Sequence, residues 1–154
     1  MSDKKPPLLY WIEDEIDLFD GLRDELEDAR FSIIPITTVS QALQCLDEIE
    51  AKPGTVVLDL WLPPGNSSTV PQKHRGPKLG LWLLNQIQDK LGRSWPILIL
   101  SGNLTADILA TLQREHGIVE DRLFAKPLIE ADRFIRTIRE CHKGLLPGSD
   151  HSAK

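Results

Sequence analysis

Five apolar runs of strand length recur along the chain and alternate with segments whose apolar residues are spaced as in helices. Such alternation indicates a parallel sheet with both faces covered, because each crossover between parallel strands carries a helix over the sheet. The predicted strands are Leu8–Ile12, Phe31–Ile36, Thr55–Leu58, Trp95–Leu100 and Arg122–Ala125. The predicted helices cover about 16–29, 42–49, 80–91, 104–116 and 128–142.

Pro35 lies inside the second predicted strand and cannot donate a ladder hydrogen bond, so this strand is expected at a sheet edge. Right-handed crossovers leave few arrangements of the remaining strands. The edge position suits the order 2-1-3-4-5. We therefore predict an α/β fold, a doubly wound, five-stranded parallel sheet of the flavodoxin-like type.

The 154 residues suffice for one domain with polar ends. We expect a disordered N-terminus over 1–7, a domain over 8–143 with a long inserted loop at 61–79, and a disordered tail over 144–154. If the chain is complete, the 27 residues that follow Pro127 leave no room for a DNA-binding or catalytic output domain.

Composition excludes several classes of protein. The net charge of -5 provides no general attraction to nucleic acid. No apolar run approaches 18 residues, and the polar segment from Met1 to Pro7 does not resemble a secretion signal, so a cytoplasmic location is expected. The two cysteines, Cys45 and Cys141, lie on predicted apolar helix faces and are expected in the core. The histidines lack metal-ligand spacing and are expected at the surface; they are His74, His116, His142 and His151.

Polar side chains stand where four of the predicted strands end. Glu13 and Asp14 follow the first strand, Asp59 the third, Ser101 the fourth and Lys126 the fifth. Carboxyl ends of parallel strands share one edge, so three carboxylates, a hydroxyl and an ammonium should meet there. A hard divalent ion such as Mg²⁺ would relieve the repulsion between the acids. The set suits phosphoryl transfer, with Asp59 as the best-held nucleophile.

These residues also carry a family resemblance. The motifs are Glu13-Asp14, Val57-Leu58-Asp59 with Pro63 four residues later, Ser101-Gly102 and Lys126-Pro127. Each motif is weak alone, but in this order and at strand ends they resemble the signature of response-regulator receiver domains. The resemblance spans about residues 8–142 and is to stand-alone, chemotaxis-regulator-like members of two-component signalling.

The resemblance implies that Asp59 accepts a phosphoryl group from a histidine kinase or a histidine phosphotransfer protein. It implies a Mg²⁺ site made by Glu13, Asp14, Asp59 and the backbone carbonyl of Trp61.

Lys126 would pair with the phosphoryl oxygens, and Ser101 would move toward the phosphate. Output is then expected on the face of the fourth helix, fifth strand and fifth helix, which would dock a downstream protein. Such a chain would be a monomer or weak dimer, would contact no nucleic acid or membrane directly, and would be a signal-transfer domain and not an enzyme, assisting only its own phosphorylation and dephosphorylation.

Two features depart from the family pattern. Receivers usually carry Tyr or Phe three residues before the lysine, where this chain has Leu123 with Phe124 beside it. The connection from Asp59 to Gly80 takes 21 residues, roughly a dozen more than receivers need. Its basic residues could steer an acidic partner, or the segment could be a solvated insertion; they are Lys73, Arg75 and Lys78.

Two other functions stay open at this point. The chain could be a receiver-like scaffold that is not phosphorylated. It could also hydrolyse phosphate esters through Asp59, although such enzymes normally place an acid two residues later, where this chain has Trp61. That indole could instead shield the phosphoryl group from water, or simply pack under the long loop.

Overall fold

The structure is a computed structural model that describes residues 6–65, 70–71, 76–102, 104–126 and 129–145. Within these residues, five strands pair in parallel in the order β2-β1-β3-β4-β5, which confirms the predicted fold class and strand order. The strands are β1 (Leu8–Ile12), β2 (Ser32–Ile36), β3 (Gly54–Leu58), β4 (Ile97–Ser101) and β5 (Leu123–Ala125). The helices are η1 (Ile16–Phe19), α1 (Asp20–Asp28), α2 (Val39–Ala51), α3 (Pro77–Leu91), α4 (Ala106–His116), η2 (Glu120–Arg122) and α5 (Ala131–Leu145).

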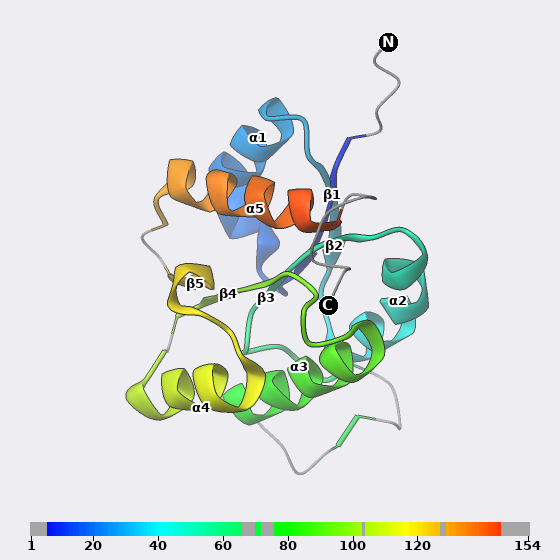
Figure 1. The fold of residues 1–154 in the computed structure, drawn as a ribbon, viewed down its shortest axis with the longest axis vertical. Coiled ribbons are helices and arrows are strands. Elements are labelled where there is room, and N and C mark those ends of the chain that lie inside the picture. The colour runs from blue at the N-terminus through cyan, green and yellow to red at the C-terminus, as the bar shows by residue number, and fades with distance from the viewer. Residues whose placement is uncertain (1–5, 66–69, 72–75, 103, 127–128, 146–154) are drawn as a thin grey trace.

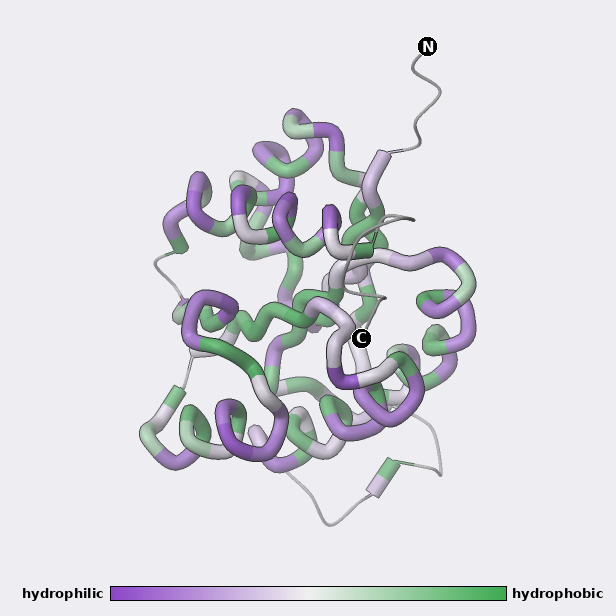
Figure 2. Tube along the Cα trace, in the orientation of Figure 1, coloured by the Kyte–Doolittle hydropathy of each residue, from purple (hydrophilic) through white to green (hydrophobic). Residues whose placement is uncertain are grey.

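The sheet is covered on both faces (Figure 1). Helices α1 and α5 lie on one face and α2, α3 and α4 on the other, each side with its own cluster of buried side chains. All residues of β3 and β4 are buried, as expected for central strands of a doubly covered sheet. Apolar residues therefore follow the strands, while polar residues gather on the outer sides of the helices (Figure 2).

Strand β2 forms one edge of the sheet, which confirms the inference drawn from Pro35. Ser32 donates its N–H to the Pro7 carbonyl, and Ile36 accepts from the Glu13 N–H. Because bonding to a parallel neighbour alternates along a strand, Pro35 faces the open edge, and no ladder hydrogen bond is lost there.

Several predicted boundaries are wrong by a few residues. The predicted helix over 16–29 is divided into η1 and α1, with Phe19 at the junction. Helix α3 begins at Pro77 rather than Gly80, since proline fits the first turn of a helix, and the predicted 61–79 loop is shorter by the same amount. The helix predicted over 104–116 begins only at Ala106, after the Thr105 N-cap; the predicted cap at Gly117 is confirmed by its φ of 66°.

The end of the chain also differs from the prediction. Helix α5 continues to Leu145, so Gly144 lies in the helix and not in a tail. No proline interrupts the sequence before Pro147, so nothing forces an earlier end. The remaining predicted tail and most of the predicted disordered N-terminus lie outside the described residues.

His116 is buried, contrary to the prediction of a surface histidine. It lies at the end of α4 against Gln88 of α3, whose amide donates to the His116 carbonyl at 2.8 Å. The His116 Nδ1 lies 2.9 Å from the Gln88 Oε1, and burial lowers the pKa of the imidazole. The pair therefore joins α3 and α4 through two side-chain hydrogen bonds. His142 is half-buried, and its pKa is lowered by burial, while His74 and His151 lie outside the described residues.

The core prediction for the cysteines is confirmed for Cys141, which is buried, and Cys45 is half-buried against the core. Among the described residues, no helix combines the length and the hydropathy needed to cross a bilayer.

Candidate functional site

The carboxyl ends of neighbouring strands bring the predicted polar side chains to one edge of the sheet. Backbone hydrogen bonds continue just past the strands: the Asp59 N–H donates to the Ile12 carbonyl and the Lys126 N–H to the Ser101 carbonyl, both at 3.0 Å. These bonds extend the ladder to the first residue after β3 and β5. Backbone hydrogen bonds thus hold Asp59 and Lys126 in place in addition to the contacts of their side chains.

Three carboxylates cluster at this edge. One oxygen each from Glu13, Asp14 and Asp59 lie within 4.8 Å of one another. Glu13 is fully buried, Asp59 is 3% exposed, and Asp14 is open to solvent. Closely grouped acid oxygens with one exposed member are the ligand set that a hard divalent cation such as Mg²⁺ prefers, with room for water on the open side.

The ammonium of Lys126 bridges two of these acids. Its Nζ lies 2.6 Å from the Glu13 Oε1 and 2.9 Å from the Asp59 Oδ2. Burial alone would lower the pKa of Lys126, but the hydrogen bonds and the charges of the two carboxylates raise it above its ordinary value. The Phe19 ring lies beside the same ammonium, with its centroid 5.3 Å from Nζ, within the range of a cation–π contact.

Glu13 is the acid most affected by its surroundings. Burial raises its pKa to about 7, and the negative charge of Asp59 adds to this, while the Lys126 ion pair opposes it. One ammonium faces two buried carboxylates, Glu13 and Asp59, with the exposed Asp14 beside them, and this leaves an excess of negative charge. A divalent cation would remove that excess, so the charge balance supports the same ligand set as the geometry.

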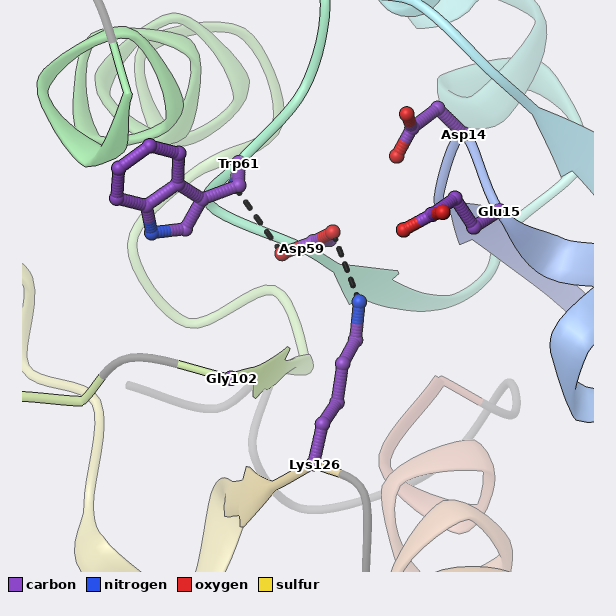
Figure 3. Close-up of a pocket in the computed structure, with 6 residues that line it drawn as sticks. All are labelled: Asp14, Glu15, Asp59, Trp61, Gly102 and Lys126. Carbon is purple, nitrogen blue, oxygen red and sulfur yellow. Dashed lines mark hydrogen bonds and ion pairs between the residues drawn. The ribbon is translucent and has the colours of Figure 1, made fainter.

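An open pocket of about 320 Å³ lies over these groups, and Figure 3 shows it from close range. Trp61 stands on one side of Asp59, and Asp14 and Glu15 stand on the other. The Trp61 N–H donates to the Asp59 Oδ1 at 3.0 Å. The pocket is lined by Asp14, Glu15, Asp59, Trp61, Gly102 and Lys126.

The two remaining predicted site residues, Glu13 and Ser101, are buried beside the pocket and do not line it. The Ser101 hydroxyl is fully buried, and within the described part of the chain no group forms a hydrogen bond with it. An unpaired buried hydroxyl is uncommon and calls for an explanation, such as a ligand atom that it meets in another state.

Known proteins resemble this chain in structure, whereas comparison of the sequence alone finds no match. No protein-family model and no curated protein matches this sequence. The structure, however, matches solved response-regulator structures over nearly its whole length. The non-phosphorylated HemR receiver domain from Leptospira biflexa is 25% identical, with a TM-score of 0.62, over 93% of this chain and 99% of that one.

Full-length FixJ from B. japonicum is 22% identical, with a TM-score of 0.71, over 97% of this chain and 64% of that one. The chain has the fold of a response-regulator receiver domain. A third match is a response regulator from Burkholderia pseudomallei with a phosphorylated aspartic acid, a calcium ion and citrate. It is 21% identical, with a TM-score of 0.61, over 90% of this chain and 70% of that one.

Receivers usually carry an aromatic side chain at the position that is Leu123 in this chain. The neighbouring Phe124 does not take over that position. Leu123 pairs with Ile99 of β4 and packs toward α2, α3 and α4. Phe124 points to the opposite face, where its ring meets Phe134 edge-on at 5.0 Å. A shift of one residue in β5 would exchange the two faces. The position facing α4 in this receiver fold therefore holds a leucine.

The connection after β3 is held at both ends. Near its start, the Pro63 carbonyl accepts the Val39 N–H at 3.0 Å, so the segment docks on the first turn of α2. At its other end, Gly76 lies against the Trp61 indole. Lys78 is exposed in the first turn of α3, while the basic residues Lys73 and Arg75 lie outside the described residues, as does Pro127.

Sequence reasoning missed three contributors to the site. Phe19 was expected only as an apolar face residue of a helix, and its contact with Lys126 has no signal in the spacing. Glu15 lines the pocket beside Asp14, and a third acid in a row could have indicated this. Gly76 could be recognised only as a turn residue.

Proposed function

We propose that this chain is a phosphoacceptor receiver of a two-component or phosphorelay system, in which Asp59 takes a phosphoryl group from a histidine kinase or a histidine phosphotransfer protein. The observation that carries the proposal is the grouping of three carboxylate oxygens within 4.8 Å of one another beside the Lys126 ammonium. A nucleophilic carboxylate, a metal-binding set and a fixed cation are the parts that phosphoryl transfer requires.

In this proposal, a carboxylate oxygen of Asp59 attacks the phosphorus, and the bond from phosphorus to the donor's histidine nitrogen breaks. Mg²⁺, when bound, would neutralise charge on the phosphoryl oxygens. Its ligands would be Glu13, Asp14, Asp59 and the backbone carbonyl of Trp61. The Burkholderia protein, with its phosphorylated aspartic acid and calcium ion, supports such a pairing of metal and phosphoaspartate in this fold.

Lys126 and Ser101 would serve the transferred group. The Lys126 ammonium lies 2.9 Å from the Asp59 Oδ2 and would pair with a phosphoryl oxygen. The buried Ser101 hydroxyl has no hydrogen-bond partner among the described residues, so a phosphoryl oxygen nearby would give it one. In this proposal Ser101 moves toward the phosphate after transfer.

The signal would leave through a protein partner. Phosphorylation adds about -1.5 to -2 charges and three acceptor oxygens at the edge of the sheet. A shift of Ser101 and of the segment after β4 would then favour the active conformation of the face formed by α4, β5 and α5. The downstream target would dock on this face. The proposed receiver domain runs from residue 8 to the end of α5, acts in the cytoplasm as a monomer or weak dimer, and catalyses only changes to its own phosphorylation.

The experiment is the intact mass of the protein after incubation with acetyl phosphate, with and without Mg²⁺. We expect a gain of one phosphoryl group in the wild type, only with Mg²⁺, and none in Asp59→Asn. Asp89→Asn, which removes an exposed carboxylate of α3, is the matched control and should be modified like the wild type. No adduct under any condition would favour the scaffold function, and sustained turnover of a phosphomonoester would favour the hydrolase.

A further inference from the structure

One wall of the pocket takes no part in the proposed chemistry. The Trp61 side chain belongs to the pocket lining, while the proposed chemistry uses only the backbone carbonyl of this residue. The residue is 47% exposed, unusual for a large aromatic side chain in a structure whose other tryptophans are buried or half-buried. An open indole beside a nucleophile is a surface on which a ligand can stack.

The backbone that carries the indole is held close to Asp59. The Trp61 backbone N–H donates to the Asp59 Oδ1 at 3.0 Å. Leu60 just before it is fully buried, and the Leu60 backbone packs so closely on Gly80 that a Cβ there would lie 2.3 Å from the carbonyl oxygen. A Cβ at Gly76 would likewise lie 2.9 Å from the ring, so glycine lets the chain close against the indole.

The pocket has a charged side and an uncharged side. Asp14 and Glu15 stand opposite Trp61, with Asp59 between them (Figure 3). A cation bound by the acids would occupy the charged side. On the other side, Gly102 is exposed, and a Cβ there would meet only the Lys126 Cβ, at 3.8 Å. Packing does not require glycine at 102, and its lack of a side chain keeps the approach to Asp59 open beside the indole.

The pocket is also larger than the phosphoryl group alone would need. Its volume of about 320 Å³ includes space that is open to solvent and bordered by Trp61 and Gly102. The space between Trp61 and Gly102 is therefore available for the part of the donor that leaves. A flat, uncharged wall favours a flat leaving group over a small aliphatic one.

We propose that Trp61 is a specificity-determining residue that stacks on the ring of an aromatic leaving group, so that the site prefers N-phosphorylated imidazoles over acyl phosphates and over phosphoramidate. This inference rests on the proposed function. In the preferred reaction an Asp59 oxygen bonds to phosphorus while the P–N bond breaks. The electron pair goes to the ring nitrogen, and neutral imidazole departs because its other nitrogen already carries a proton. With acetyl phosphate and phosphoramidate the leaving molecules, acetate and ammonia, offer no ring to stack.

The test compares rates of phosphorylation by phosphoimidazole, phosphoramidate and acetyl phosphate at one Mg²⁺ concentration. A stacked aromatic pair corresponds to about a 2- to 10-fold preference, which sets the expected scale. In Trp61→Leu the ratio of the phosphoimidazole rate to the phosphoramidate rate should fall by this factor. Trp61→Phe should keep most of the ratio, because it keeps a ring.

Trp82→Leu is the matched control, since Trp82 is half-buried on α3 and does not line the pocket; its ratio should equal that of the wild type. An unchanged ratio in Trp61→Leu, or equal slowing with all three donors, overturns the stacking and leaves the proposed function intact. Failure of all three donors to modify the wild type overturns the proposed function itself. Because each ratio compares donors on the same protein, partial unfolding of a variant cancels from it.

Discussion

The two faces of the sheet are packed with different side chains, and each supports a different half of the pocket. Under α1 and α5 the core is rich in aromatic rings, with Trp11 5.7 Å from Phe19 and 6.0 Å from Phe134. Under α2, α3 and α4 the fully buried side chains are aliphatic apart from Tyr10.

On the aromatic face, the Phe19 ring contacts the Lys126 ammonium, which belongs to the charged half of the site. On the aliphatic face, Gly76 lies against the Trp61 indole, and Gly80 packs against the backbone of Leu60, the residue before Trp61. One half is thus positioned by large side chains and the other by the absence of side chains. Substitutions on the two faces should therefore fail in separable ways, and the following variants test this.

The largest effect is expected at the centre of the aromatic face. Trp11→Ala should lower the free energy of unfolding by about 3–5 kcal/mol, because several rings lose their contact with one fully buried side chain. On the aliphatic face Ile87→Val should lower it by only about 0.5–1.5 kcal/mol. Both are measured by urea denaturation.

Trp11→Phe is the control for the aromatic face. It keeps a ring and removes a buried indole N–H that has no hydrogen-bond partner among the described residues, so it should lower stability much less than Trp11→Ala. Equal losses in the two variants would show that the full volume of the indole, and not merely the presence of a ring, is needed to fill this face.

On the aliphatic face, the second effect is expected at Gly80. A Cβ there would lie 2.3–2.7 Å from backbone atoms of Leu60, which cannot rotate away. Gly80→Ala should lower the free energy of unfolding by about 1–3 kcal/mol. Gly21→Ala in α1, where no atom lies within 4 Å of the added Cβ, should instead raise it by about 0.5–1 kcal/mol. A neutral Gly80→Ala would refute the close packing proposed for this half.

The charged half should make stability depend on pH. Folding raises the pKa of Glu13 to about 7 through burial, from an ordinary value of 4.5. The folded chain therefore holds a proton that the unfolded chain releases between these values. The free energy of unfolding should fall as pH rises through this window, by up to about 3 kcal/mol in the absence of divalent metal.

The measurement is urea denaturation with EDTA from pH 5 to 8, comparing the wild type with Glu13→Gln. The lowered pKa values of His116 and His142 give the opposite slope below about pH 6.5 in both proteins, so the difference between the two curves isolates Glu13. Parallel curves would contradict the raised pKa. Saturating Mg²⁺ should remove the difference in slope.

The smallest effect is expected at Phe19. Its cation–π contact with Lys126 is worth about 0.5–1 kcal/mol, so Phe19→Leu should slow modification by acetyl phosphate by about 2- to 5-fold. Phe31→Leu is the control, because Phe31 packs in the same face and has no contact with Lys126. It should reduce stability and leave the rate unchanged. Equal slowing in both variants would indicate a general loosening of the face.

The position of the charged residues could be predicted from the sequence. Glu13, Asp59 and Lys126 each follow a run of apolar residues, and carboxyl ends of parallel strands share one edge whatever the side chains around them. The edge position of β2 followed from one proline for a similarly general reason. These inferences needed only periodicity and chain topology.

The contacts within each half could not be predicted in this way. Phe19 and Lys126 are 107 residues apart in the chain, and only the turn from η1 into α1 places the ring beside the ammonium. The contact between Gly76 and Trp61 depends on a φ of 59°, which no spacing rule provides. His116 did carry a signal, because it lies four residues after the buried Leu112 and so on the same helix face.

Pro35 has a consequence for the behaviour of the protein at high concentration. Its ring nitrogen faces the open edge of β2, where a strand from another copy would otherwise find a hydrogen-bond donor. Edge strands are the sites at which sheets of separate molecules join, and a proline there discourages such joining. The residue that reveals the edge in the sequence thus also keeps that edge from recruiting a neighbour, and Pro35→Val should favour self-association more than it alters folding.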